Sequence, residues 1–204
     1  MTLDQYRSAA DRLLGPWVRA AARLGLSPDQ VSVLAFGVAV AAAGAFAVGD
    51  ALFYAVGAVC VLLNGWLDLV DGALARHLEV SSDGGDLLDH VLDRYADIAI
   101  IAGFTVGIGA YALGFLAVTG VLMTSYMGTQ IQAVGIGREY GGLLGRADRL
   151  ALMGAVGLIA AAYSAPIVAG LNVVGLLLAL FAAVGHLTAV QRFRGAWSDL
   201  RGGL

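Results

Sequence analysis

The stretch DLVDGALARHLEVSSDGGDLLDHVLDRYAD, residues 68–97, decides how this chain must fold. It contains seven aspartates, yet an apolar run ends at its first residues and another begins at its last. Asp68 and Asp71 share one helical face with Gly72 and Ala75, because residues three or four apart lie one above another on a helix. A stripe of carboxylates beside two small residues is therefore predicted at the end of the first apolar helix.

A second stripe begins the next apolar helix, where Asp89, Asp93 and Asp97 recur every four residues. The connection over residues 77–84 is short, so the two helices are expected to be antiparallel neighbours whose stripes face each other. Carboxylates that converge in a partly dehydrated pocket need protons or cations to neutralise them. Oxygen ligands favour Mg²⁺, Mn²⁺ or Ca²⁺ over zinc. The pattern predicts a divalent-metal site, with Arg76 as counter-charge for a phosphate ligand.

The composition places this site in a membrane protein. Of 204 residues, 59% are hydrophobic and 13% are charged, and the mean hydropathy is +0.82. Soluble domains carry about 25% charged residues. The net charge of −3 provides no basic field for nucleic acid. Cys60, the single cysteine, excludes an intrachain disulfide and a CxxC metal site.

Apolar segments of about 20 residues, the length that crosses a bilayer, divide the chain. We predict an all-α integral membrane protein with a single membrane domain over residues 1–204. Residues 1–26 form an amphipathic interfacial helix, residues 30–190 a bundle of six transmembrane helices, and residues 191–204 a cytoplasmic tail. The six predicted spans are 30–48, 52–74, 87–109, 112–134, 149–164 and 167–190.

The distribution of basic residues predicts the orientation. Short links at residues 49–50, near Ala110 and at 164–166 are expected on one side of the membrane, with the longer charged segments and both termini on the other. Every basic residue is an arginine and falls on that second side. By the positive-inside rule this side is cytoplasmic, so the aspartates face the cytoplasm. The arginines are Arg7, Arg12, Arg19, Arg23, Arg76, Arg94, Arg138, Arg146, Arg149, Arg192, Arg194 and Arg201.

The pattern Asp68-x2-Asp71-Gly72-x2-Ala75-Arg76-x8-Gly85-x3-Asp89-x3-Asp93 resembles the signature of the CDP-alcohol phosphotransferases, also called CDP-alcohol phosphatidyltransferases, at all eight fixed positions. The resemblance implies an enzyme of phospholipid biosynthesis that transfers a phosphatidyl-type group from a CDP-linked lipid to an alcohol and releases CMP. It implies two divalent ions, Mg²⁺ or Mn²⁺, on Asp68, Asp71, Asp89 and Asp93. It implies a donor site along Asp68, Gly72, Ala75, Arg76 and Gly85, with Asp93 also acting as the catalytic base. It further implies a homodimer in contact with membrane lipid.

The acceptor is expected to be a small polar alcohol that carries a phosphate. Arg138, Arg146 and Arg149 cluster before the fifth span, and arginines suit phosphate groups, although the positive-inside rule also accounts for them. Family members that use inositol phosphate tend to carry a basic residue after the Ser-Tyr of the fourth span, where this chain has Met127 and Gly128. Glycerol phosphate is therefore favoured ahead of inositol phosphate, and a non-phosphorylated acceptor such as serine is the alternative.

Two other classes remain open at this point. Membrane prenyltransferases also bind lipid diphosphates through aspartates and Mg²⁺, but with DxxxD spacing in two halves. A divalent-cation transporter needs charged groups on both sides, and Asp50 is the only charge expected on the far side. The sequence does not distinguish ester- from ether-linked donors, and it assigns no role to Asp97 or His77.

Overall fold

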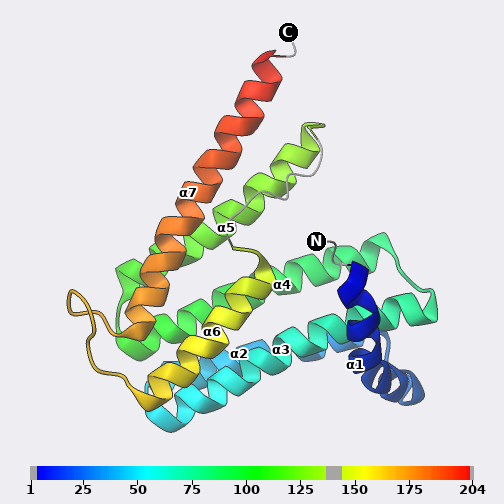
Figure 1. Cartoon of the computed structure of the whole chain (residues 1–204), viewed down its shortest axis with the longest axis horizontal. Helices are drawn as coiled ribbons and strands as arrows, with labels where there is room; N and C mark the ends of the chain where they lie inside the picture. The colour runs from blue at the N-terminus through cyan, green and yellow to red at the C-terminus, as the bar shows by residue number, and fades with distance from the viewer. Residues whose placement is uncertain (1–3, 137–143, 203–204) are drawn as a thin grey trace.

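The computed structural model describes residues 4–136 and 144–202, with side chains over residues 13–136 and 144–201. Within these residues the chain is helical apart from turns, loops and one isolated bridge between Val168 and Leu171. The predicted all-α class is confirmed. The helices are α1 (Asp4–Arg23), α2 (Pro28–Val48), α3 (Ala51–Leu78), α4 (Asp83–Ile108), α5 (Tyr111–Ala133), α6 (Arg146–Ala162) and α7 (Val173–Gly202) (Figure 1).

Four of these helices, α2, α3, α5 and α7, are long and apolar enough to cross a membrane. Helices α4 and α6, which the sequence predicts as the third and fifth spans, do not meet this measure within the part of the chain described. Helix α4 carries six charged side chains between Asp83 and Asp97. Helix α6 has 17 residues. At about 1.5 Å per residue, the length of this helix is less than the roughly 30 Å thickness of the hydrocarbon core of a bilayer. An integral membrane protein is supported, and the number of six spans stays a prediction.

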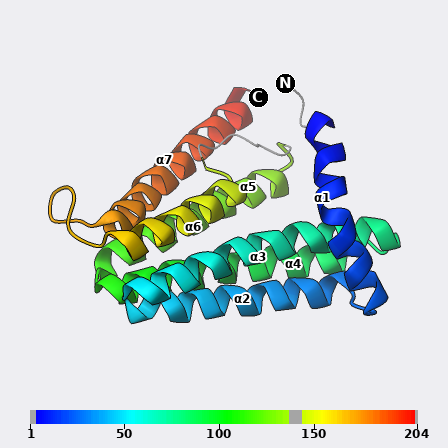
Figure 2. The ribbon, with the colours of Figure 1, turned by 60° about the horizontal axis from the view of Figure 1, so that its bottom comes forward.

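Two of the three predicted short turns are confirmed, across residues 49–50 and 109–110. The third is wrong, because α6 ends at Ala162 and a loop over residues 163–172 precedes α7. Pro166 lacks the amide hydrogen that a continuing helix would donate, and the chain reverses between Val168 and Leu171. Figures 1 and 2 show both turns and this loop at one end of the molecule, as the predicted sidedness requires.

Helix α7 differs from the predicted span 167–190 at both ends. It begins at Val173, where Asn172 Oδ1 accepts a hydrogen bond from Gly175 N at 2.9 Å. It then continues as a helix to Gly202, through the described part of the segment 191–204 that the sequence assigns to a tail. Helices α5 and α7 pack against each other and extend together beyond the other helices (Figure 1).

Helix α1 lies against one end of α3 (Figure 2). Its Leu14 and Val18 are buried in a small core with Val70 of α3, whereas the neighbouring Leu13 and Trp17 are exposed. One face of this amphipathic helix therefore packs on the protein, and the adjacent exposed apolar residues suit the membrane interface that the sequence predicts.

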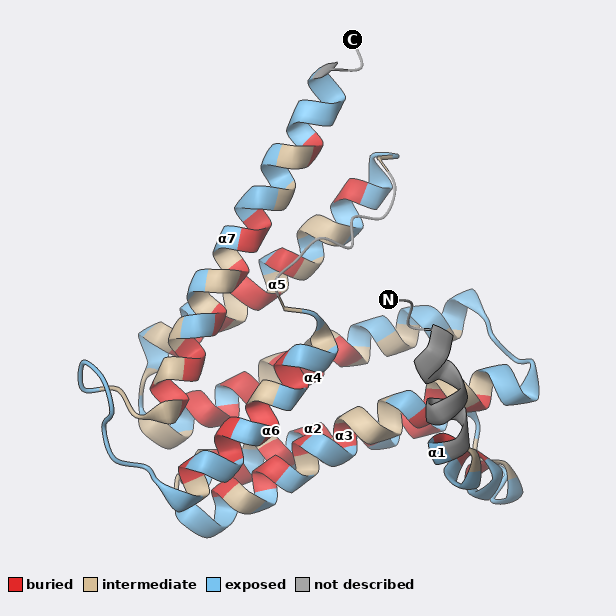
Figure 3. Cartoon of the chain, viewed as in Figure 1, coloured by how far each residue is buried: buried red, intermediate tan, exposed pale blue. Residues whose placement is uncertain are grey.

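The site is held by the three-helix unit of α2, α3 and α4, where much of the core lies (Figure 3). Phe46 of α2 stacks on Phe104 of α4 with ring centroids 3.8 Å apart. Gly103 lets the two backbones approach, since a Cβ there would lie 2.3 Å from the Ala43 carbonyl oxygen. Helix α3 is tied to α2 by Asn64, whose Nδ2 donates to Ala35 O at 2.9 Å. Helix α2 thus fixes the relative position of the two helices that carry the aspartates.

Candidate metal and substrate site

Three of the predicted metal ligands converge between α3 and α4. Asp68, Asp71 and Asp89 each offer one carboxylate oxygen, and these oxygens lie within 4.8 Å of one another. We call these residues the carboxylate trio. Ser32 of α2 donates a hydrogen bond from Oγ to Asp71 Oδ2 at 2.7 Å, which orients that ligand. A trio of hard oxygen donors at this separation fits a divalent ion such as Mg²⁺ or Mn²⁺.

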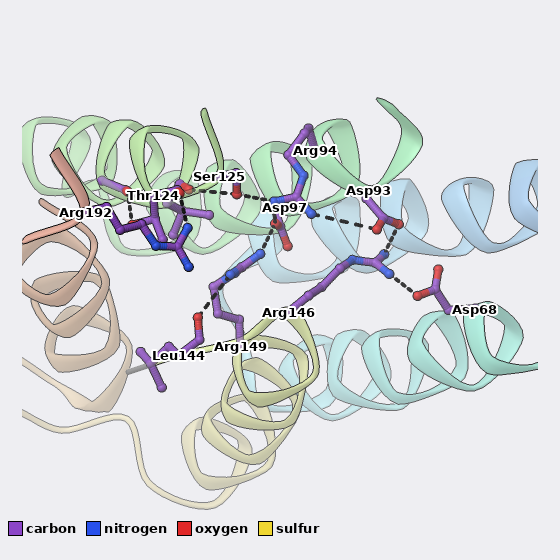
Figure 4. Close-up of polar contacts among 12 residues, drawn as sticks. Asp68, Asp93, Arg94, Asp97, Thr124, Ser125, Leu144, Arg146, Arg149 and Arg192 are labelled. Atoms are coloured by element: carbon purple, nitrogen blue, oxygen red, sulfur yellow. Dashed lines mark hydrogen bonds and ion pairs between the residues drawn. The ribbon is translucent and has the colours of Figure 1, made fainter. Parts of the chain in front are cut away.

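Asp93, the fourth predicted ligand, is linked to the trio by an arginine. Its Oδ1 atom lies 2.6 Å from Nη2 of Arg146, and Nη1 of the same guanidinium pairs with Asp68 (Figure 4). Arg94 lies on the other side, with Nη2 3.8 Å from Asp93 Oδ2. Arg146 therefore brings α3, α4 and α6 together at the carboxylates, and Asp93 has two cationic neighbours within the described chain.

The predicted donor residues also come together. Gly72, Ala75 and Gly85 line a cavity of about 80 Å³ with Asp71 and Asp89 of the trio, and we call it the donor cavity. A Cβ on Gly72 would meet only Arg76 Nη1 within 4 Å, at 3.6 Å. A side chain at position 72 would therefore not clash with a neighbouring helix. The absence of one leaves open space beside the trio. Arg76 is exposed beside this glycine.

A second and larger cavity, of about 580 Å³, lies among α4, α5 and α7. We call it the arginine cavity, because Arg94 and Arg192 line it. Arg94 donates to Ser125 Oγ, and Arg192 Nη1 donates to Thr124 O at 2.6 Å (Figure 4). Small-molecule sites commonly have volumes of about 300–1,000 Å³. The cavity is therefore large enough for a polyol phosphate, and it shares Arg94 with Asp93.

Sequence reasoning did not single out Arg94 or Arg192 as site residues. The positive-inside rule accounts for the presence of both arginines on this side of the membrane. Because Arg94 directly follows the predicted ligand Asp93, its position in the sequence indicates that it lies near the site. No sequence feature indicates the same for Arg192, because its approach to the cavity depends on how α7 packs against α5.

The three arginines predicted to bind the acceptor have different surroundings. Arg138 lies outside the described residues, so its role stays a prediction. Arg146 contacts Asp68 and Asp93, at the centre of the site. Arg149 is 5% exposed, and its Nη2 lies 2.7 Å from Asp97 Oδ2. The structure thus gives Arg149 a buried carboxylate as partner, where the sequence expected a position facing a ligand.

Comparison with known proteins agrees with this site. The model of the CDP-alcohol phosphatidyltransferase family matches residues 25–187, which include the trio, the lining of the donor cavity and α6, and end before Arg192. The chain belongs to the CDP-alcohol phosphatidyltransferase family. It is a transferase, and the prenyltransferase and cation-transporter alternatives are set aside.

Two relatives of this CDP-alcohol phosphatidyltransferase are informative. An archaetidylinositol phosphate synthase of Methanothermobacter thermautotrophicus is 32% identical over 98% of this chain and 96% of its own length. The phosphatidylinositol phosphate synthase of Mycobacterium tuberculosis, solved with CDP-DAG bound, superposes with a TM-score of 0.77 at 26% identity, over 91% of this chain and 94% of that chain. A second structure of that synthase, in complex with manganese and citrate, superposes with a TM-score of 0.77 at 25% identity, over 90% of this chain and 88% of that one.

Proposed function

We propose that this transferase moves a phosphatidyl group, or its ether-lipid equivalent, from a CDP-linked lipid to inositol phosphate and releases CMP. The observation that carries the proposal is the arginine cavity, whose Arg94 also contacts Asp93 at the edge of the metal site. Two arginines that line one cavity suit a phosphorylated acceptor. The names of both relatives refer to inositol phosphate products.

This proposal reverses the order of the two acceptors that the sequence favours. The missing basic residue at positions 127–128 counted against inositol phosphate. Arg192 offers a replacement, since its Nη1 would lie 3.0 Å from a Cβ at Gly128. The guanidinium therefore occupies the space beside the glycine, where a longer side chain at position 128 would otherwise project.

In the proposed reaction, Asp68, Asp71, Asp89 and Asp93 hold two divalent ions, Mg²⁺ or Mn²⁺. When bound, the ions supply positive charge that neutralises the donor pyrophosphate and the leaving CMP. The donor lies along Asp68, Gly72, Ala75, Arg76 and Gly85, so its head group enters the donor cavity. Phosphoryl transfer depends mainly on alignment and neutralisation of charge, and these residues provide both.

Asp93 is the proposed base. It accepts the proton of the acceptor hydroxyl, whose oxygen then attacks the β-phosphorus as the bond to CMP breaks. Of the four proposed ligands, Asp93 is the one that contacts Arg94, a residue of the arginine cavity, so it lies on the side from which the acceptor arrives. Arg94, Arg146 and Arg192 hold the acceptor phosphate so that the hydroxyl lies beside Asp93.

The surrounding topology belongs to the same proposal. Six helices cross the cytoplasmic membrane, namely the four candidate spans together with α4 and α6. Helix α1 lies in the membrane interface. The trio and both termini face the cytoplasm, where CDP-linked and water-soluble substrates meet. A homodimer in contact with membrane lipid is also expected.

The test is a panel of acceptors assayed for CMP release by purified protein with Mn²⁺ and CDP-diacylglycerol or its ether analogue. Inositol phosphate is expected to give the highest kcat/KM, ahead of glycerol phosphate and serine. Preferential release of CMP with glycerol phosphate or serine would overturn the acceptor assignment and leave family membership intact.

A further inference from the structure

Asp97 is a buried carboxylate to which the proposed reaction gives no task. It lies one helical turn beyond Asp93 on α4 and is 1% exposed. It is not a member of the carboxylate trio. A buried carboxylate is strongly destabilising unless it is paired, so its partners indicate its role.

One partner is Arg94, a wall residue of the arginine cavity. Asp97 Oδ2 lies 3.6 Å from Arg94 Nη1, the same atom that donates to Ser125 Oγ. The Arg94 side chain is 28% exposed, whereas Asp97 lies behind it. Asp97 and Ser125 therefore restrain the guanidinium of a residue that lines the arginine cavity.

The other partner is Arg149. Arg146 and Arg149 lie one turn apart on α6, and Asp93 and Asp97 lie one turn apart on α4. The result is two parallel ion pairs, Arg146–Asp93 at 2.6 Å and Arg149–Asp97 at 2.7 Å (Figure 4). Helix α6 packs mainly on α3, so these pairs fix the start of α6 relative to α4. The Arg149–Asp97 pair is the more buried of the two.

We propose that Asp97 is a positioning residue for acceptor binding. Its carboxylate holds Arg94 at the wall of the arginine cavity and, through Arg149, anchors the turn of α6 that carries Arg146. The proposal rests on the proposed function, because it takes the arginine cavity as the acceptor site. It assigns Asp97 no contact with metal, donor or acceptor.

The first test is Asp97→Asn, which removes the charge and keeps the shape. The KM for inositol phosphate is expected to rise about 10-fold or more, since bonds to charged groups contribute about 1.5–3 kcal/mol. The KM for CDP-diacylglycerol and the affinity for Mn²⁺, measured by electron paramagnetic resonance of the protein alone, are expected to stay within about twofold. Asp83→Asn, at an exposed position on the same helix, is the matched control.

A second variant separates positioning from stability. Asp97→Asn leaves Arg149 buried without a counter-charge, which destabilises the fold. The double variant Asp97→Asn with Arg149→Met removes both buried charges and is expected to recover much of the unfolding temperature. Its acceptor KM is expected to stay raised, because Arg94 still lacks its restraint. Recovery of the acceptor KM together with stability would show a merely structural pair and overturn the proposal.

A third comparison tests the route through Arg94. In an Arg94→Gln background, Asp97→Asn is expected to change the acceptor KM less than it does in the wild type, because part of the interaction is already absent. Equal effects in the two backgrounds would overturn the proposal, as would an unchanged acceptor KM in Asp97→Asn or a loss of Mn²⁺ affinity. Failure of the proposed function itself is distinct, since it would appear as wild-type protein that does not use inositol phosphate.

Discussion

Asp89 differs from the other two residues of the carboxylate trio in having no counter-charge or hydrogen-bond donor among the residues described. Asp68 pairs with Arg146, and Asp71 accepts a hydrogen bond from Ser32. Asp89 can therefore be changed without breaking an ion pair between helices. A substitution at Asp89 therefore tests metal binding with the least effect on the stability of the fold.

We predict that Asp89→Asn lowers Mn²⁺ affinity and turnover, each by at least about 100-fold, because even indirect support of a metal ligand contributes 10- to 100-fold to affinity. Asp83→Asn, exposed in the first turn of the same helix, is expected to change neither. Mn²⁺ titration followed by electron paramagnetic resonance measures the affinity, and CMP release measures turnover. Undiminished Mn²⁺ affinity in Asp89→Asn would remove the trio as the metal site.

Arg192 provides a second prediction at this scale. Arg192→Gln is expected to raise the KM for inositol phosphate by about 10- to 100-fold, since a hydrogen bond to a charged group contributes about 1.5–3 kcal/mol. The KM of the CDP-linked donor should not change. Arg194→Gln, an exposed arginine two residues further along α7, is the control. Steady-state kinetics with each substrate varied in turn measures both values, and a change confined to the donor KM would contradict the prediction.

At the scale of elements, the separation of α2 and α4 depends on glycine. Gly103 has the Ala43 carbonyl oxygen against it, and a Cβ at 2.3 Å from that atom cannot be accommodated without moving a helix. Gly37 of α2 has nothing within 4 Å of its would-be Cβ. The same substitution at these two positions therefore distinguishes helix packing from helix propensity.

We predict that Gly103→Ala destabilises the protein by about 1–3 kcal/mol, the usual range for overpacking. Gly37→Ala is expected to be neutral or slightly stabilising, because alanine favours a helix over glycine by about 1 kcal/mol. Thermal unfolding of the detergent-solubilised protein, followed by intrinsic fluorescence, measures both. An equal unfolding temperature for the two variants would show that α2 and α4 are not closely packed at Gly103.

At the scale of the whole molecule, the two ends of the helical bundle differ in chemistry. The trio, the donor cavity and the loop over residues 79–82 lie toward one end, while the turns at 49–50 and 109–110 and the loop at 163–172 lie at the other (Figure 2). A membrane around the bundle would separate these two ends. The proposed orientation then puts the trio on the cytoplasmic side.

This orientation predicts the accessibility of introduced cysteines. In a Cys60→Ala background, Ser164→Cys in the loop before α7 is expected to react with a membrane-impermeant maleimide in intact cells. Ser81→Cys, in the loop between α3 and α4, is expected to react only after the cells are permeabilised. Both positions are exposed in the protein, so accessibility reports the side of the membrane. The reverse pattern would place the active site outside the cytoplasm.

The sequence by itself determined the features that depend on local periodicity. The three- and four-residue spacing of the aspartates predicted two facing carboxylate stripes, and Asp68, Asp71 and Asp89 converge accordingly. Apolar runs of membrane length predicted the helical class, and the turn at residues 49–50 fell where glycine and an N-capping aspartate interrupt the pattern. Each of these follows from neighbours within a few helical turns.

Only the tertiary structure decided which distant groups share a site. Asp97 and Arg149 are 52 residues apart in sequence, and Arg192 reaches its cavity only because α7 continues past the predicted end of the span. Arginine side chains are long, so the partner of each one depends on how helices cross rather than on its position along one helix. The positive-inside rule explained the number and side of the arginines, but the packing of α4, α5, α6 and α7 determined which of them line the arginine cavity and which are buried in ion pairs.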